Sequence, residues 1–314
     1  MTARVEPMGN IESTNPTAPG VERSGAIAGM SAYILWGLIT IFWKALKHFA
    51  PLELIGFRIS LSVVLLFVIL AWRGRIRPLL RRLTAERLWG RVLLTAILLS
   101  INWTTYVVVV HEGKAIEAAL GYFIAPLGTM LIGVRVLGER LRPVQMVSAG
   151  LAFVAVVVLT VGYGRLPVYA LTMAGTWAFY GLLKRQVPLP PVESLFAETI
   201  VLFVPAIVLI AAHVHYPNSV YHSADAWHLF LVALTGIVTA VPLLLFAHAA
   251  LHLPLTVLGP MQYSVPTINF LLGWLAYHEE LTPSRVVGFG LVWVALVIVT
   301  VDSIRRSRSA SSPR

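Results

Sequence analysis

Ten apolar stretches, each about twenty residues long and almost free of charge, fill most of this 314-residue chain. Residues 143–161 and 283–302 are clear examples. A helix rises about 1.5 Å per residue, so roughly twenty apolar residues cross a hydrocarbon layer about 30 Å thick. A helix also satisfies its own backbone hydrogen bonds where there is no water. The sequence therefore predicts an all-α integral membrane protein with ten transmembrane helices.

Composition supports this prediction, because 58% of the residues are hydrophobic and only 12% are charged. A soluble domain carries about 25% charged residues. Residues 1–24, with several prolines and glycines, are expected to form a disordered cytoplasmic tail, and residues 303–314 a short basic one. The absence of cysteine excludes disulfides and thiolate metal sites. The expected spans are 25–46, 52–72, 89–110, 117–137, 143–161, 166–184, 192–212, 227–249, 254–277 and 284–302.

The net charge of +10 would suggest nucleic-acid binding in a soluble protein. Here the basic residues gather in short segments between spans, so we expect a lipid bilayer as partner and no nucleic acid. Positive loops stay in the cytoplasm, and alternation then places both termini there, in the inner (cytoplasmic) membrane of the cell. The loop after residues 52–72 carries the densest group, with Arg73, Arg75, Arg77, Arg81, Arg82 and Arg87 against Glu86.

The chain also repeats itself, since residues 126–161 align without a gap on residues 266–301. A weaker echo pairs Trp36-Gly37 with Tyr180-Gly181. Each half, 25–161 and 162–302, then holds five spans, and an odd number inverts the second half in the membrane. Inverted repeats are typical of secondary transporters, which rock two halves around one midplane site. The aligned pairs are Pro126/Pro266, Gly133/Gly273, Glu139/Glu279, Pro143/Pro283 and Gly150/Gly290.

Several segments resemble the EamA-type drug/metabolite transporter family, and within it the RarD subfamily, over residues 25–305. The resemblance implies ten helices in two EamA repeats and a permease; RarD members are commonly described as chloramphenicol-sensitive proteins. Ala125 departs from the polar Asn expected before the proline. The resemblance is carried by Asn102-Trp103, EAALGYFIAP at 117–126, FYGL at 179–182, Glu198-Thr199 with Pro205, GIVTAVPL at 236–243, and Gln262-Tyr263 with Pro266-Thr267.

Charged residues inside spans are candidates for function, because each costs about 3 kcal/mol at the bilayer centre. Arg58 either holds an anionic substrate or pairs with Glu53 or Glu117. Glu117 suits a helix N-terminus and could instead act as a gate.

Glu198 is the best acidic candidate by depth. It either carries a coupling proton or forms a structural pair with Lys184 or Arg185.

Uncharged polar and aromatic side chains within the spans give a second group of candidates. The amides of Asn102, Gln262 and Asn269 either bind substrate or join neighbouring helices. Aromatic rings near a cavity would stack on flat or cationic solutes, and otherwise they pack against helices or lipid. The aromatic candidates are Trp36, Trp103, Tyr106, Tyr122, Trp177, Tyr180 and Tyr263.

Prolines interrupt several spans, and each removes a backbone hydrogen bond. We expect Pro126, Pro242 and Pro266 to act as hinges. The paired glycines of the repeat are expected to permit close helix contacts. Histidines of the loop after residues 192–212 are expected to be solvated, and no metal site is predicted.

The sequence lacks a nucleotide-binding loop, a nucleophile elbow and a zinc-protease motif, so we expect neither an enzyme nor a cofactor. It predicts a secondary transporter, a permease that exports a small metabolite or drug-like solute by alternating access. Protons are a possible coupling ion, and the protein is expected to be a monomer or homodimer. The alternative is a flippase or membrane-embedded enzyme acting on a lipid-linked substrate.

Overall fold

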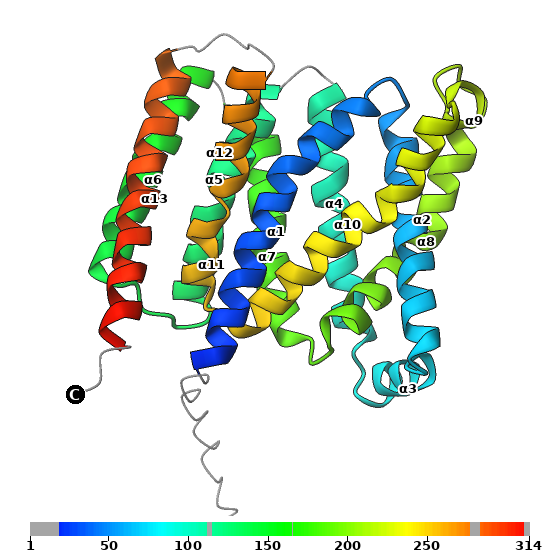
Figure 1. The fold of residues 1–314 in the computed structure, drawn as a ribbon, viewed down its shortest axis with the longest axis horizontal. Coiled ribbons are helices and arrows are strands. Elements are labelled where there is room, and N and C mark those ends of the chain that lie inside the picture. The colour runs from blue at the N-terminus through cyan, green and yellow to red at the C-terminus, as the bar shows by residue number, and fades with distance from the viewer. Residues whose placement is uncertain (1–18, 112–114, 165, 277–282, 311–314) are drawn as a thin grey trace, which may run out of the picture.

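The computed structural model describes residues 19–111, 115–164, 166–276 and 283–310, and there the chain is helical between short connections. Figure 1 shows the long helices side by side in one bundle, with α3 at the lower end and α9 at the upper end. The elements are α1 (Pro19–Ala45), α2 (Pro51–Trp72), α3 (Ile76–Ala85), α4 (Trp89–His111), α5 (Ala115–Arg135), α6 (Pro143–Tyr163), α7 (Val168–Gln186), α8 (Pro191–His213), α9 (Val220–Ser223), α10 (Ala226–His252), α11 (Leu255–Met261), α12 (Ser264–Leu271), the π-helical turn η1 (Leu272–Ala276) and α13 (Pro283–Ala310).

The bundle has the outer surface of a protein that lies in lipid. In the described residues, α1, α2, α4, α6, α8 and α10 are long and apolar enough to cross a membrane, and shorter apolar stretches cover 120–135 and 286–298. Large apolar side chains such as Phe67, Phe153 and Val204 are exposed on the outside. A helix that is apolar on all sides fits hydrocarbon rather than water. The chain is therefore a multi-pass membrane protein.

Local sequence signals explain where several helices start and stop. Pro51, Pro143 and Pro191 open α2, α6 and α8. A first-turn proline loses no helical hydrogen bond, because that N–H has no partner inside the helix. Gly164 ends α6 with φ of 77°, a left-handed conformation that glycine adopts without a steric cost.

Three segments differ from the sequence expectation, and the first two are residues 73–88 and the start of α1. Residues 73–88, expected as a loop, include α3, whose Leu79 and Leu83 are buried one turn apart while its arginines lie outside. This is an amphipathic helix, too short and too charged to appear as a span. Helix α1 begins at Pro19, inside the tail expected to be disordered.

The expected span 254–277 is not one helix but α11, α12 and η1 in succession. Pro260 and Pro266 both lack the N–H that would continue the ladder, and the chain turns between Met261 and Ser264. The amide of Gln145 partly compensates, because its Nε2 donates to the Thr256 carbonyl at 3.4 Å, four residues before Pro260. Broken helices of this kind are common at transporter binding sites.

Helix contacts follow a pattern of exchange between the two halves of the chain. Helix α1 contacts α10 and α12, while α7 contacts α4 and α5. Helix α2 contacts α8, α6 contacts α13, and α5 contacts α11. In order along each half, α1, α2, α4, α5 and α6 correspond to α7, α8, α10, α11–α12 and α13. When each helix is replaced by its counterpart, every contact named here becomes another contact of the same set. For example, the contact of α1 with α10 becomes that of α7 with α4.

Two glycines allow α2 to lie against second-half helices at very short range. A Cβ atom at Gly56 would lie 2.7 Å from the carbonyl oxygen of Ala206. A Cβ atom at Gly236 would lie 2.8 Å from the carbonyl oxygen of Leu61. Neither position has room for a side chain while the backbones stay in place.

The glycines of the internal repeat behave differently from one another. A Cβ atom at Gly133 of α5 would lie 3.2 Å from Leu255 Cβ of α11, so the expected close helix contact is confirmed there. At Gly150 and Gly290 a Cβ atom would meet nothing within 4 Å, so the same expectation was wrong for this pair. The surroundings of Gly273 fall outside the described part of the structure.

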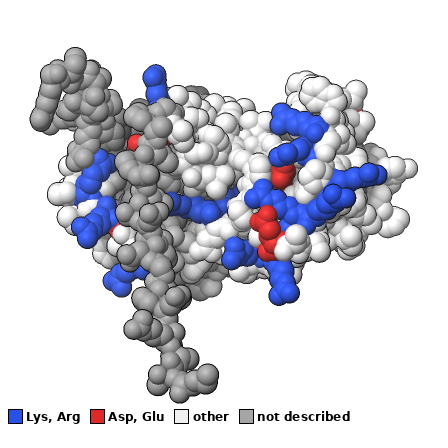
Figure 2. All heavy atoms as spheres, turned by 90° about the horizontal axis from the view of Figure 1, so that it is seen from below, with Lys and Arg blue, Asp and Glu red and all other residues white. Residues whose placement is uncertain are grey.

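Both described ends of the chain lie at the lower end of the bundle, where α1 starts and α13 finishes (Figure 1). Figure 2 views this end from below and shows many lysine and arginine side chains on it. Helix α3, which carries Arg77, Arg81 and Arg82, lies at this end (Figure 1).

Candidate functional site

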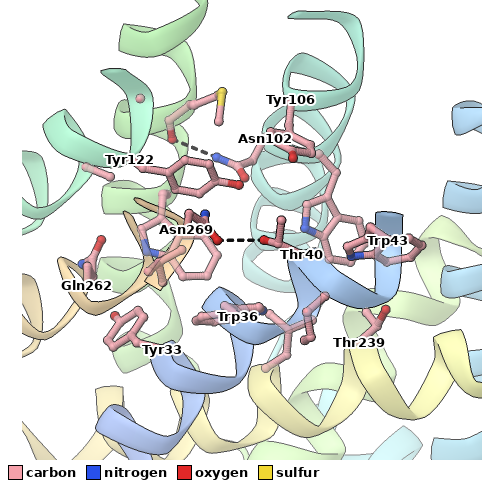
Figure 3. Close-up of a pocket in the computed structure, with 18 of the residues that line it drawn as sticks. Tyr33, Trp36, Thr40, Trp43, Asn102, Tyr106, Tyr122, Thr239, Gln262 and Asn269 are labelled. Carbon is pink, nitrogen blue, oxygen red and sulfur yellow. Dashed lines mark hydrogen bonds between the residues drawn. The ribbon is translucent and has the colours of Figure 1, made fainter. Parts of the chain in front are cut away.

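A cavity of about 160 Å³ lies among α1, α2, α4, α5, α7, α10 and α12. It is lined by the second half of α1, the third turn of α2, the second half of α4 and the first half of α7. These parts lie toward the end of the bundle opposite α3 (Figure 1). Figure 3 shows the lining side chains. Its lining residues are Tyr33, Trp36, Ile39, Thr40, Trp43, Arg58, Asn102, Trp103, Tyr106, Gly121, Tyr122, Ala125, Met173, Trp177, Val238, Thr239, Leu243, Gln262, Val265 and Asn269.

Nine of the thirteen predicted substrate residues meet at this cavity. They come from helices far apart in the sequence and from both halves of the chain. Ala125, where the resemblance led us to expect a polar residue, also lines the cavity. The nine are Trp36, Arg58, Asn102, Trp103, Tyr106, Tyr122, Trp177, Gln262 and Asn269.

Arg58 forms one side of the cavity. Its Nε donates to Thr239 Oγ1 at 3.2 Å, and its Cζ lies 4.1 Å from the ring centre of Trp103 and 5.3 Å from that of Trp43. The expected pair with Glu53 is not formed. The carboxylate of Glu53 instead accepts hydrogen bonds from the hydroxyl of Ser219 and the backbone N–H of Val220. The side chain of Glu117, the other expected partner and a predicted site residue, lies outside the described part of the structure.

Aromatic rings make most of the remaining wall. The rings of Trp36 and Trp177 meet edge to face with centres 5.2 Å apart. The rings of Tyr106 and Tyr122 do the same at 6.0 Å. Such pairs are favourable beyond the area they bury, and they hold the wall in a defined shape.

The three amides at the cavity also join helices to one another. Asn102 Nδ2 donates to the Met173 carbonyl at 2.8 Å, which ties α4 to α7. Thr40 Oγ1 donates to Asn269 Oδ1 at 2.8 Å and ties α1 to α12 (Figure 3). Gln262 Nε2 donates to Thr129 Oγ1 at 2.8 Å. For these residues the structural role foreseen in the sequence is confirmed, and their role toward a solute stays a prediction.

Sequence reasoning missed four polar or aromatic members of the lining: Tyr33, Thr40, Trp43 and Thr239. Three of them share one helix face with Trp36, at spacings of three or four residues along α1. This polar and aromatic stripe on an otherwise apolar span was the available signal.

The hydroxyl of Tyr33 has an unusual position. The residue is 2% exposed, and its Oη finds no hydrogen-bond partner among the described atoms. The side chains of Trp177 and Gln262 come near it without reaching hydrogen-bond geometry. A buried hydroxyl without a partner is costly, and at a cavity it is a group that a ligand can satisfy.

Three predicted site residues lie away from the cavity. Tyr180 stacks on Phe246 with ring centres 5.9 Å apart, and its hydroxyl donates to Glu198 Oε2 at 3.1 Å. Tyr263 donates to the Phe123 carbonyl at 3.2 Å. Glu198 is fully buried and accepts from Lys184 Nζ at 2.6 Å, which is the structural pair anticipated as one of its two roles.

A second ionic group lies at the same lower level as the Lys184–Glu198 pair. Glu139 accepts from Arg185 Nη1 at 2.7 Å and from the backbone N–H groups of Leu255 and Thr256 at 3.0 and 2.8 Å. A carboxylate is stabilised at a helix N-terminus by these free N–H groups. We call Glu139, Arg185, Lys184 and Glu198 the lower closure, because they join α7, α8 and α11 between the cavity and the basic end.

The predicted hinge prolines adjoin the cavity in a regular way. A proline cannot donate to the carbonyl four residues before it. For Pro126 and Pro242 inside α5 and α10, these carbonyls belong to Tyr122 and Val238, and both residues line the cavity. Pro266, near the start of α12, stands in the same relation to Gln262. The hinge role itself stays a prediction.

Within the described residues, no group of three or more histidine, aspartate or glutamate side chains is placed to hold a metal ion. The chemistry available at the cavity is therefore that of one guanidinium, several hydroxyl and amide groups, and aromatic surfaces. These groups suit reversible binding.

Comparison with known proteins agrees with this geometry. The EamA-like transporter family matches the chain twice, over residues 23–161 and 166–301. The chain belongs to the EamA-like transporter family. Among EamA relatives, Protein RarD of Streptomyces exfoliatus is 44% identical over 93% of this chain and 92% of its own length. The uncharacterized transporter YojE of Bacillus subtilis is 33% identical over 92% of this chain and 98% of its own length.

A solved crystal structure with 20% sequence identity has a TM-score of 0.66 and covers 92% of this chain and 99% of the other. At this identity the likeness concerns the fold alone. The EamA membership thus rests on sequence, and the shared helical architecture agrees with it.

Proposed function

We propose that this protein is a secondary transporter that exports a small solute across the cytoplasmic membrane by alternating access. The observation that carries the proposal is that both halves of the chain contribute to the cavity wall. Helices α1, α2, α4 and α5 of the first half and α7, α10 and α12 of the second half each contribute to it, together with Gln262 between α11 and α12. Rocking one half against the other would change access to such a site without dismantling it.

In this proposal ten crossings form two inverted repeats of five helices. The helix contacts that exchange with one another between the halves support this arrangement. The basic lower end faces the cytoplasm, as the positive-inside rule requires, with both termini there. The cavity lies on the far side of the lower closure, so the described conformation is closed toward the cytoplasm.

A flux assay with purified protein in liposomes tests the proposal. We expect saturable movement of at least one member of a broad panel of small amphipathic solutes, compared with protein-free liposomes. Filling the cavity with Ala125→Leu should lower this flux, while Ala71→Leu, at an exposed position near the end of α2, should not. An imposed pH gradient separates proton coupling from facilitated diffusion. The proposal would be contradicted if the folded, unmodified protein moved no solute of the panel, or if the folded Ala125→Leu variant moved solutes as fast as Ala71→Leu.

The same liposomes distinguish the main competitor. A flippase for lipid-linked substrates would move a labelled lipid between leaflets and leave the solute panel unmoved. We expect the opposite result, because the cavity is about 160 Å³ and is built for a small solute.

A further inference from the structure

The cavity has a charge imbalance. Of the described residues that line it, Arg58 alone carries a formal charge at neutral pH. No described carboxylate lies within 4 Å of its guanidinium. A cation in a membrane-spanning segment is costly and is normally paired. The described part of the wall thus presents one positive charge to whatever enters.

Three carboxylates among the described residues are committed elsewhere. Glu53, five residues before Arg58 on α2, accepts from Ser219 Oγ at 2.7 Å and from the backbone N–H of Val220 at 3.0 Å. Glu198 and Glu139 belong to the lower closure. These carboxylates cannot reach Arg58 without losing the partners that they have.

Arg58 is also held in place with free donors. One donor, Nε, binds Thr239, and the plane lies against Trp103. A guanidinium has five N–H donors, and no described residue accepts from the terminal pair of nitrogens. A planar fork fixed by stacking and one hydrogen bond matches a carboxylate, which accepts two parallel hydrogen bonds.

The rest of the cavity fits a flat ring. The space of about 160 Å³ is close to the 150 Å³ that suffices for benzene in an apolar engineered cavity. Trp36, Trp177, Tyr106 and Tyr122 supply the ring surfaces around it. The unpartnered hydroxyl of Tyr33, buried at the wall, is a second and independent sign that a ligand completes the site.

We propose that the cavity binds small aromatic carboxylates, with Arg58 holding the carboxylate and the aromatic wall holding the ring. This inference rests on the transport function proposed above and names the class of solute. A cationic aromatic solute is excluded by the charge of Arg58. A neutral one would leave that charge without a partner.

Binding of three isosteric probes tests the proposal in the whole protein in lipid nanodiscs, by fluorine NMR. The probes are 4-fluorobenzoate, 4-fluorobenzamide and 4-fluorobenzylammonium. We expect the benzoate to bind at least roughly tenfold more tightly than the amide, as a charge-assisted pair predicts, and the ammonium not to bind. Equal binding of benzoate and benzamide would overturn the proposal.

Arg58→Met should remove the preference for benzoate while leaving the weak binding of benzamide. Arg58→Lys keeps the positive charge and should restore part of the preference for benzoate. Such a partial recovery shows that the loss in Arg58→Met is due to the charge and not to misfolding. Arg75→Gln, which removes an arginine outside the cavity, is the matched control. Benzoate binding that survives Arg58→Met, or full displacement by chloride at equal concentration, would also overturn the proposal.

Binding and flux fail separately in this design. If benzoate binds through Arg58 but no solute crosses liposomes, the transport function is wrong and the anion site stands. If other solutes cross but benzoate does not bind, the transport function stands and the solute class is wrong.

Discussion

Lys184 Nζ lies 2.6 Å from Glu198 Oε1, and both side chains are almost fully withdrawn from the surface, at 2% and 0% exposure. Ser194 and Tyr180 donate further hydrogen bonds to the same carboxylate, at 3.2 and 3.1 Å. Burying two charges is costly, so their attraction is needed mainly to offset that cost. The pair therefore makes the junction of α7 and α8 depend on both partners being present.

Removing one partner should destabilise the protein more than removing both charges. We expect Lys184→Met to cost about 3 kcal/mol, because it leaves a buried carboxylate uncompensated. The double variant Lys184→Met/Glu198→Gln should recover most of this loss, since the amide still accepts from Tyr180. Thermal unfolding in detergent measures the free energies. A double variant as unstable as the sum of the two singles would contradict this account.

Glu139→Gln should loosen the lower closure. The amide loses the charge that Arg185 and the N-terminus of α11 stabilise. A loss of about 1.4 kcal/mol in the closed form would change its balance with an open form tenfold. The chain contains no cysteine, so Ala125→Cys provides a single label in the cavity. We expect faster labelling from the cytoplasmic side in the Glu139→Gln background.

The exposed ion pair of α3 provides the control for that experiment. Arg82 Nε lies 2.8 Å from Glu86 Oε1, with both side chains about 40% exposed. Such surface pairs contribute little, roughly 0–1 kcal/mol. Glu86→Gln should therefore leave the labelling rate unchanged. Equal labelling rates in the Ala125→Cys protein and in its Glu139→Gln and Glu86→Gln variants would mean that Glu139 does not limit access to the cavity from the lower end.

Gly236→Ala should be strongly destabilising, whereas Gly150→Ala should not. A methyl group at Gly236 would lie 2.8 Å from the Leu61 carbonyl oxygen, so α2 and α10 would have to separate. Overpacking of this kind costs about 1–3 kcal/mol. At Gly150 the space is open, and alanine should even stabilise α6 by about 0.5 kcal/mol. Thermal unfolding of both variants checks the contrast, and similar losses at the two positions would contradict it.

Stability at low pH should depend on Asp225, the N-cap of α10. The backbone N–H of His228 donates to its carboxylate at 2.8 Å and holds the pKa of Asp225 below its ordinary value. Because the folded pKa is the lower one, this contribution is present above the unfolded pKa and is lost as pH falls through the folded pKa. Asp225→Asn keeps the cap and should flatten the dependence of the melting temperature on pH below about 4. An unchanged pH profile would contradict this role.

Much of the architecture follows from local features of the sequence. Each of the ten expected spans contains helix, because apolar length and proline or glycine at the ends are properties of short segments. The repeat, the arginine-rich segment and the family resemblance are also visible along the chain. An interruption at Pro266 was expected, but the end of one helix at Met261 and the start of another at Ser264 were not. The helix α3 was missed because only two of its residues, Leu79 and Leu83, are buried, which is too short an apolar pattern to indicate a helix.

The sequence by itself determined that the chain lies in a membrane, that its halves are related, and which residue types are available for a site. Only the tertiary structure decided which of them meet. Arg58 faces Thr239 and Trp103 rather than Glu53, Tyr33 and Trp43 join the cavity, and Glu198 turns to Lys184. The physical reason is that helix formation depends on neighbours a few residues away. The face that each helix turns toward the others depends on how seven of them pack around one space.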